Sequence, residues 1–160
     1  MSVGGARRTE ILDTAAALFA SSGLQTSLKE IADACGILPG SLYHHFESKE
    51  ALIVELVERY QADLDAIADE AVAALHEGDE PIDERIATLG IAIAACAVRH
   101  RAALLLTLYE PPSAAGNDLV RAVQRSPLAI EKAMLDTFVV GQERGYLRSG
   151  IDLETMADRL

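Results

Sequence analysis

Hydrophobic side chains recur every three or four positions along most of the chain, which is the spacing of an amphipathic helix. The first such stripe contains Ile11, Ala15 and Phe19 and ends at the run 21–23, Ser-Ser-Gly. Glycine readily adopts the left-handed conformation that terminates a helix. Because no alternating run is long enough for a convincing strand, the pattern predicts an all-α fold.

Two short helices are predicted next, joined by a tight turn. Residues 27–30, Ser-Leu-Lys-Glu, match the capping box, in which the serine and the glutamate satisfy backbone amides at a helix start. Gly36 is expected to end this helix. The following segment, 37–46, contains Pro39 near its beginning, where the missing amide hydrogen is tolerated, and it ends before Ser48.

The longest predicted helix begins at Ser48, whose hydroxyl suits a cap. Its apolar stripe runs from Leu52 to Leu75, which is about seven turns. The run 76–81 then brings together glycine, proline and several charges, so it is predicted to separate two parts of the chain.

Beyond this run, proline and glycine divide the helical pattern into shorter pieces. Pro111 and Pro127 interrupt it because proline cannot donate a helical hydrogen bond, and Gly145 is expected to end a helix. Asp152 opens a last helix that reaches only about two turns by Leu160. The predicted stripes lie at 82–93, 103–109, 119–123 and 130–138.

The composition fits helices packed at close range. Half of the 160 residues are hydrophobic, but only 4% are aromatic and tryptophan is absent, so the core is expected to consist of Ala, Leu, Ile and Val. This length allows one domain, or a small module fused to a second bundle, and excludes a large multidomain enzyme.

Several classes of protein and site are not expected. The longest apolar runs fall short of the roughly 20 residues that cross a bilayer, and no apolar stretch follows Arg7 and Arg8 as in a signal peptide. We therefore expect a cytoplasmic protein without a membrane partner. Cys35 and Cys96 are far apart and belong to no zinc-ligand motif, so neither a disulfide nor a metal or other cofactor is predicted.

The charge is unevenly divided. The formal net charge is −11, but residues 1–50 hold four basic and six acidic side chains, and 51–160 hold ten and nineteen. The first part, at 4 − 6 = −2, is nearly balanced, whereas the second, at 10 − 19 = −9, is strongly acidic. A nearly balanced part can still bind nucleic acid if its cations gather on one face and helix N-termini add positive potential.

The two short helices form a candidate helix-turn-helix, whose second helix enters a DNA major groove. Thr26 and Ser27 offer hydroxyl and amide groups to a phosphate at a helix start, and Lys49 offers its ammonium group at the next. Further hydrogen-bonding side chains on or beside the second helix are Ser41, Tyr43, His44 and His45.

The run FASSGLQTSLKEIADACGILPGSLYHHFESKEAL resembles the N-terminal DNA-binding domain of the TetR family of bacterial transcriptional regulators. The resemblance covers roughly 9–56 and rests on the glycine-ended apolar helix, the Thr-Ser pair, and the G-S-L-Y-x-H-F-x-S-K-E-x-L run. A weaker similarity, at 142–153, concerns the junction between the seventh and eighth helices of the family.

This resemblance implies a helix-turn-helix DNA-binding domain at 1–50 and a helical effector-binding and dimerisation domain at 51–160. It implies a homodimer that binds a palindromic operator in double-stranded DNA, and a small-molecule effector that releases the repressor. The family has a complete eighth helix and a ninth. Here the last helices are expected to be incomplete, by truncation or because the dimer is built differently.

The DNA-binding residues are carried over by position. Those matching phosphate-binding positions are Thr26, Ser27, Tyr43 and Lys49, and those matching base-facing positions are Pro39, Gly40, Ser41 and His44. Tyr43 could instead pack beneath the first helix. A metal pair at His44 and His45 is disfavoured because adjacent helical positions point about 100° apart.

The resemblance places an effector pocket among Cys96, His100, Tyr109, Met134 and Phe138, although for any one of these residues ordinary core packing is the favoured explanation. The GSLYHHF run is reminiscent of relatives that sense fatty-acyl or steroid-derived CoA esters. No catalytic motif such as GxSxG or HExxH occurs, so an enzyme is not predicted. The alternative function is a helical protein–protein interaction module, which the net acidity would suit.

Overall fold

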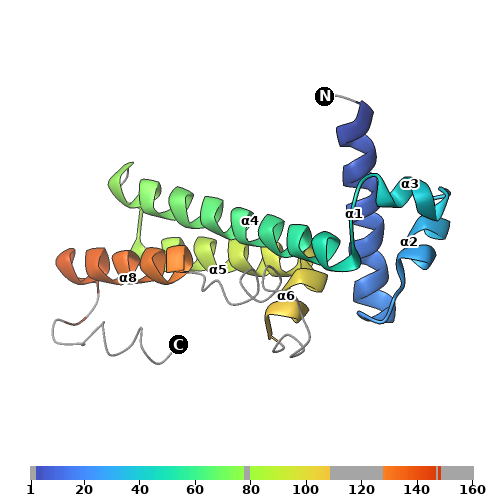
Figure 1. Ribbon diagram of the computed structural model, residues 1–160. Coiled ribbons are helices and arrows are strands. Elements are labelled where there is room, and N and C mark those ends of the chain that lie inside the picture. The colour runs from blue at the N-terminus through green and yellow to red at the C-terminus, as the bar shows by residue number, and fades with distance from the viewer. Residues whose placement is uncertain (1–2, 78–79, 109–127, 147, 149–160) are drawn as a thin grey trace. The chain divides into compact units, whose positions relative to one another are not determined.

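The computed structural model describes residues 3–77, 80–108, 128–146 and 148. All regular elements within these ranges are helices, which confirms the predicted all-α fold (Figure 1). The predictions at Tyr109, at 119–123 and at the helix opened by Asp152 lie outside the described residues. The helices are α1 (Val3–Ser22), α2 (Leu28–Ala34), α3 (Pro39–Tyr43), α4 (Lys49–Glu77), α5 (Ile82–Arg99), α6 (Arg101–Leu108) and α8 (Leu128–Glu143).

The helix ends follow the local sequence signals. Ser27 caps α2 in a complete capping box, and the Ser48 hydroxyl accepts the Ala51 amide at 3.0 Å at the start of α4. Three glycines with positive φ follow helices, as their lack of a Cβ permits. They are Gly23 at 81°, Gly36 at 65° and Gly145 at 76°.

One predicted helix is shorter than expected. The segment 37–46 contains only the five residues of α3, and His44 and His45 follow in a turn. The amides of His45 and Phe46 both donate to the Leu42 carbonyl, at 2.9 and 3.0 Å, which closes this turn. The spacing of hydrophobic residues could not distinguish a longer helix from a short helix followed by a turn. Both structures place Leu42 and Phe46 on the same side of the segment.

The described residues divide into two compact units. One falls within Met1–Tyr60 and Arg99–Arg125, and the other within Gln61–Val98 and Ser126–Leu160. In the first unit, α2 and α6 pack against α1, and α3 packs against α2. Its core contains the almost fully buried side chains of Ile11, Leu12, Phe19, Ile31, Leu42, Phe46, Leu52 and Val57.

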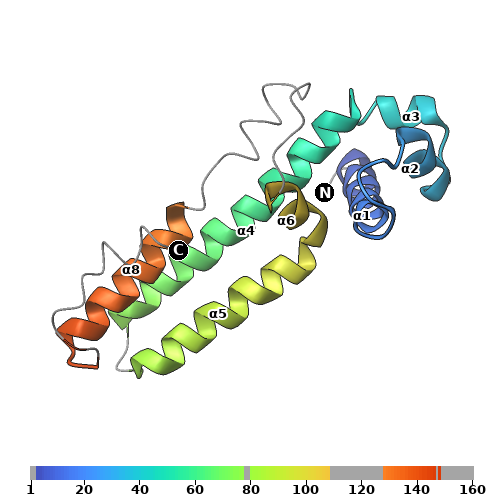
Figure 2. The ribbon, with the colours of Figure 1, turned by 90° about the horizontal axis from the view of Figure 1, so that it is seen from below.

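In the second unit, the C-terminal part of α4 runs alongside α5 and α8 (Figures 1 and 2). Two arginines satisfy carbonyls of the last turn of α4, which have no partner inside the helix. Arg85, only 8% exposed, donates to the Ala74 carbonyl, and Arg144 donates to the Leu75 carbonyl at 3.4 Å. Side chains from α5 and the end of α8 therefore hold the end of α4.

Among the described helices, none is by itself both long and apolar enough to cross a membrane. The pair α5 and α6, which is broken at His100, meets that length and composition only when the two helices are counted together.

Candidate nucleic-acid interface and ligand cavity

The capping box fixes the start of α2. The Glu30 carboxylate accepts the Ser27 amide at 2.7 Å and the Ser27 hydroxyl at 2.8 Å. The Glu30 amide lies 3.2 Å from the same hydroxyl oxygen. These local bonds orient the helix that supports α3, and the buried side chains of Ile31 and Ala32 attach it to the core of the first unit.

The same bonds lower the pKa of Glu30. The Ser27 amide is the largest cause, followed by the Ser27 hydroxyl, because both donate to the ionised carboxylate. The positive charge of Lys49 lowers the pKa of Glu30 by a smaller amount, whereas desolvation raises it. Glu30 is therefore ionised as part of the cap, and it brings negative charge close to the predicted phosphate contacts.

Most predicted base-facing residues lie at the surface. Gly40, Ser41 and His44 are exposed, and Pro39 is half-buried at the first position of α3. Tyr43 is 54% exposed, so its ring is not packed beneath α1. The short α3 thus presents a row of small and hydrogen-bonding side chains to solvent.

The predicted phosphate contacts differ in accessibility. Ser27 is exposed, but Thr26 is only 6% exposed and its hydroxyl donates to the Gly23 carbonyl at 2.9 Å. Lys49 is half-buried; its ammonium group donates to the Leu24 carbonyl and lies 5.8 Å from the centre of the Phe19 ring. The structure thus gives Thr26 and Lys49 structural contacts, and their phosphate-binding roles remain predictions.

Two basic residues of α1 bind the rest of the unit. Arg7 donates to Glu10 at 2.6 Å and to the Cys35 carbonyl at 3.2 Å. Arg8 donates to the His45 carbonyl and to Glu55, and its guanidinium lies 4.1 Å above the Phe46 ring. These arginines hold α1 against the turns before and after α3, a role that sequence reasoning did not find.

Leu38 is the second feature that sequence reasoning missed. It is the N-cap residue of α3, makes no side-chain cap bond, and is 77% exposed. The only sequence signal was its type, since Ser, Thr, Asp and Asn are the usual caps and leucine cannot accept an amide hydrogen.

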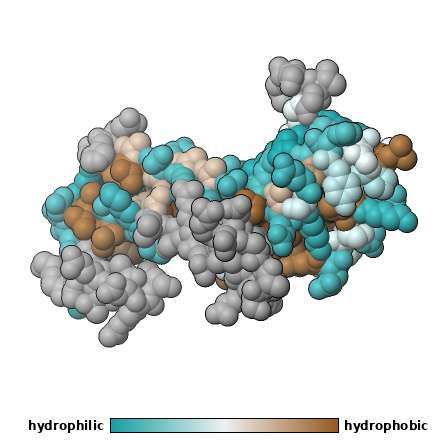
Figure 3. Space-filling view, in the orientation of Figure 1, coloured by the Kyte–Doolittle hydropathy of each residue, from teal (hydrophilic) through white to brown (hydrophobic). Residues whose placement is uncertain are grey.

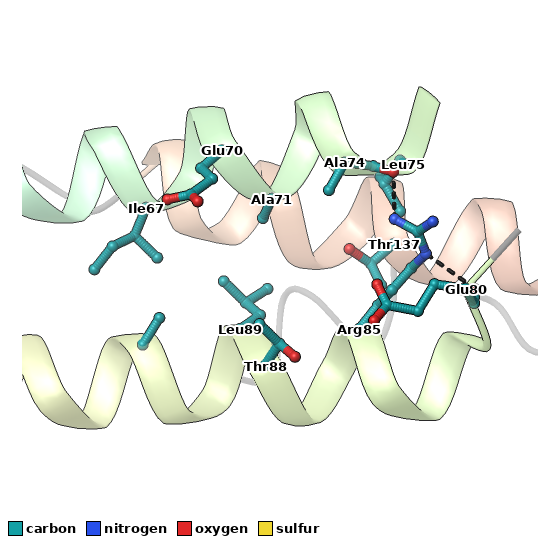
Figure 4. A pocket seen from close by; sticks show the side chains of 11 residues that line it. Ile67, Glu70, Ala71, Ala74, Leu75, Glu80, Arg85, Thr88, Leu89 and Thr137 are labelled. Atoms are coloured by element: carbon teal, nitrogen blue, oxygen red, sulfur yellow. Dashed lines mark hydrogen bonds between the residues drawn. The ribbon is translucent and has the colours of Figure 1, made fainter. Parts of the chain in front are cut away.

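Two neighbouring cavities lie in the second unit and share Leu89 and Thr137. The larger, of about 210 Å³, lies between α4 and α5, with Arg85 at one end and Thr137 contributed by α8 (Figure 4). Its lining is mainly aliphatic and includes Ile67, Ala71, Ala74, Leu75, Leu89 and Ala92. The smaller, of about 120 Å³, is lined by Ile86, Leu89, Gly90, Ile93, Met134, Thr137 and Phe138.

The predicted pocket residues separate into three groups. Met134 and Phe138 line the smaller cavity. Cys96 is fully buried in the second unit, and His100 belongs to the first, where its ring lies 5.8 Å from that of Tyr60; neither lines the two cavities. Tyr109 lies outside the described residues, so the pocket as a set remains a prediction.

Arg85 and Thr137 are polar groups that sequence reasoning missed. Arg85 occurs within the apolar stripe of α5, and its Nε donates to the Glu80 carbonyl at 3.1 Å, as the dashed line in Figure 4 shows. The Thr137 hydroxyl, 3% exposed, donates to the Ala133 carbonyl at 2.7 Å. Both satisfy their hydrogen bonds with backbone carbonyls, as buried polar groups require.

The chain matches known proteins in its DNA-binding part and over nearly its whole length. The family model described as bacterial regulatory proteins, tetR family, matches residues 11–56. The HTH-type transcriptional repressor KstR2 of Rhodococcus jostii (strain RHA1) is 34% identical over 149 residues, which cover 92% of this chain and 71% of that protein.

Solved structures show the same similarity. KstR2 of Mycobacterium tuberculosis, described as a ketosteroid transcriptional regulator, superimposes with a TM-score of 0.74 and 32% identity, over 96% of this chain and 76% of that one. The regulator PfmR from Thermus thermophilus has a TM-score of 0.73 at 23% identity, over 93% and 79%, and shows the fold alone. These repressor relatives favour DNA binding over a protein–protein module. The chain therefore belongs to the TetR family and is a TetR-like DNA-binding transcriptional repressor.

Proposed function

We propose that two copies of this chain bind a palindromic operator, each with α3 in the major groove of one half-site. The observation that carries this proposal is the exposed row formed by Ser41, Tyr43 and His44 on and after α3. Recognition helices place such residues against base edges, while flanking groups bind phosphates.

In this arrangement the contacts divide into two kinds. Pro39, Gly40, Ser41 and His44 face bases, and the small size of Gly40 lets the backbone approach closely. The phosphates are bound by the groups at the starts of α2 and α4 and by the Tyr43 hydroxyl: Thr26, Ser27, Tyr43 and Lys49. Both donors of the buried Thr26 already point at the Gly23 carbonyl, the hydroxyl at 2.9 Å and the amide at 3.3 Å. A phosphate contact at Thr26 therefore requires the longer amide bond to be shared with a phosphate oxygen.

The test measures binding of fluorescent operator and of an unrelated duplex by anisotropy. Tyr43→Phe removes one hydroxyl and is expected to weaken both complexes about fivefold, because a hydrogen bond to a charged phosphate is lost. His44→Ala is expected to weaken the operator complex alone. Tyr146→Phe is the matched control, since Tyr146 is also 54% exposed but lies in the second unit.

Equal effects of Tyr43→Phe and Tyr146→Phe, together with no loss of operator preference in His44→Ala, would overturn the proposed interface. Circular dichroism of each variant establishes that its helices are retained.

We also propose that the two cavities bind the apolar part of an effector that belongs to the fatty-acyl or steroid-derived CoA esters. The aliphatic lining of the larger cavity supports an apolar ligand. The relative described as a ketosteroid transcriptional regulator supports the steroid-derived class.

Release from DNA follows from differential affinity. An effector that binds more tightly to a conformation unable to fit both half-sites lowers operator affinity by the ratio of its two affinities. α4 is suited to carry such a change, since one continuous helix bears Lys49 at its start and cavity residues near its end.

A steroid-derived acyl-CoA, a long-chain fatty-acyl-CoA and CoA alone are titrated into the operator complex. Ala71→Phe, which fills the larger cavity, is expected to raise the releasing concentration at least about tenfold. Ala73→Phe, on the same helix but exposed and outside the lining, is the control and is expected to behave as wild type. Release by CoA alone, or equal responses of both variants, would contradict the assignment.

A further inference from the structure

Leu38 is an isolated apolar side chain beside the proposed recognition helix. It is 77% exposed, the highest value among large hydrophobic residues of the first unit that the structure describes. Figure 3 shows hydrophobic atoms standing out at the edge of an otherwise largely polar surface over α2 and α3. The side chain contacts little of its own protein, so it is accessible to a partner.

With Leu38 at its N-cap, α3 lacks the side-chain cap that a polar residue would provide. At the N-cap, a serine or aspartate would satisfy an amide, and replacing such a residue by an apolar one costs about 1 kcal/mol. Leu38 makes no side-chain cap bond, and because it is 77% exposed, little packing offsets this loss.

Leu38 stands at the start of α3, directly before the predicted base-facing residues. It precedes Pro39, the first residue of the helix, and its carbonyl accepts the Ser41 amide at 2.9 Å. The first residues of a recognition helix are the ones that reach base edges. In the major groove, the only apolar group on a base edge is the C5 methyl of thymine.

We propose that Leu38 contacts a thymine C5 methyl in each operator half-site. This inference rests on the proposed placement of α3 in the major groove. It adds a specificity determinant that carries no hydrogen bond, and it requires a T·A pair at one fixed position in each half of the operator.

The test uses operator duplexes in which single thymines are replaced symmetrically by deoxyuridine, which differs only by the missing methyl. For the wild-type protein, one replacement per half-site is expected to weaken binding about threefold to fivefold for each methyl group removed, while the other replacements have no effect. Leu38→Ala is expected to bind the unmodified operator more weakly and to lose its sensitivity to that replacement.

Ile91→Ala is the matched control, because Ile91 is 71% exposed but lies on α5 in the second unit. It is expected to keep the full penalty for deoxyuridine. Binding of wild type and of Leu38→Ala is measured on the unmodified duplex and on the deoxyuridine duplex. The four values isolate the interaction between the leucine side chain and the thymine methyl, whatever each substitution does to stability.

Three results would overturn the inference: no sensitive thymine in either half-site, a deoxyuridine penalty that persists in Leu38→Ala, or an equal loss of the penalty in Ile91→Ala. If the inference fails while His44→Ala still loses operator preference, α3 lies in the groove and only the leucine contact is wrong. If both fail, the proposed interface fails as well, and Leu38 is left as a contact for another protein.

Discussion

At the scale of single residues, the neighbouring hydroxyl side chains at the start of α2 have different structural roles. Ser27 is exposed and caps α2, whereas Thr26 is buried and bonds the preceding turn. The sequence predicts the cap, because it depends on residues three positions apart. It could not separate the accessibility of the two hydroxyls, which depends on how the turn after Gly23 packs.

The first prediction concerns the capping box. Ser27→Ala is expected to lower the free energy of unfolding by about 1 kcal/mol, the usual cost of a lost N-cap. It is also expected to raise the pKa of Glu30 toward its ordinary value of 4.5, because one of the two Ser27 donors disappears. The measurements are urea unfolding and an NMR titration of the Glu30 carboxyl, with Ser22→Ala as the control.

The sign of the pH dependence follows from that lowered pKa. A carboxyl with a lower pKa in the folded state stabilises the protein above its unfolded pKa, and the contribution is lost as the pH falls through its folded pKa. The Ser27→Ala deficit is therefore expected to shrink in acid. A deficit that grew as the pH fell below the ordinary pKa of 4.5 would contradict this assignment.

At the scale of helices, backbone conformation decides what a glycine tolerates. Gly36 has a φ of +65° between α2 and α3, whereas Gly90 lies within α5 and is not among the glycines with positive φ. A Cβ built at either position meets no atom within 4 Å, so an alanine would clash with no neighbouring residue at Gly36 or at Gly90. The two sites therefore differ only in backbone conformation.

The second prediction uses this matched pair. Gly36→Ala is expected to lower the free energy of unfolding by about 1–2 kcal/mol, the cost of a left-handed conformation for an L residue. Gly90→Ala is expected to raise it by about 0.5–1 kcal/mol, because glycine is entropically unfavourable inside a helix. Chemical unfolding of the two variants measures both, and equal signs would refute the argument.

The third prediction concerns the end of α4. Arg85→Met keeps much of the aliphatic stem but removes the donors to Ala74 and Glu80, so both carbonyls lose a charged hydrogen-bond partner. It is expected to cost about 1–3 kcal/mol of unfolding free energy. Arg101→Met, at an exposed arginine, is the control and is expected to change stability by less than about 0.5 kcal/mol.

At the scale of the whole molecule, net acidity and DNA binding have to be reconciled. The chain carries a net charge of −11, and the first unit engages both α1 arginines in contacts with its own groups. Of the basic residues in 1–50, Lys29 is exposed and Lys49 half-buried, so few cations face a phosphate backbone. Sequence-specific contacts therefore have to supply a large share of operator affinity.

The fourth prediction is a shallow salt dependence. With two lysines per protomer of the proposed dimer, log K against log salt is expected to have a slope of about −4 or shallower. Lys49→Gln is expected to make that slope shallower by about 2. Arg8→Gln can weaken binding by loosening α1, but it should leave the slope unchanged; a change equal to that of Lys49→Gln would mean that Arg8 touches phosphate.

The sequence by itself determined the helical fold, the helix starts at Ser27 and Ser48, the turns at Gly23 and Gly36, and the family. These features depend on residues a few positions apart, so caps, glycines and hydrophobic periodicity specify them directly.

Only the tertiary structure decided which polar and apolar side chains are accessible. Arg8 is engaged by His45 and Glu55, and Arg85 by Ala74, although these partners are distant in the chain. Leu38 is exposed although its type favours burial. Burial and pairing are set by which distant segments come together, and no local pattern records that.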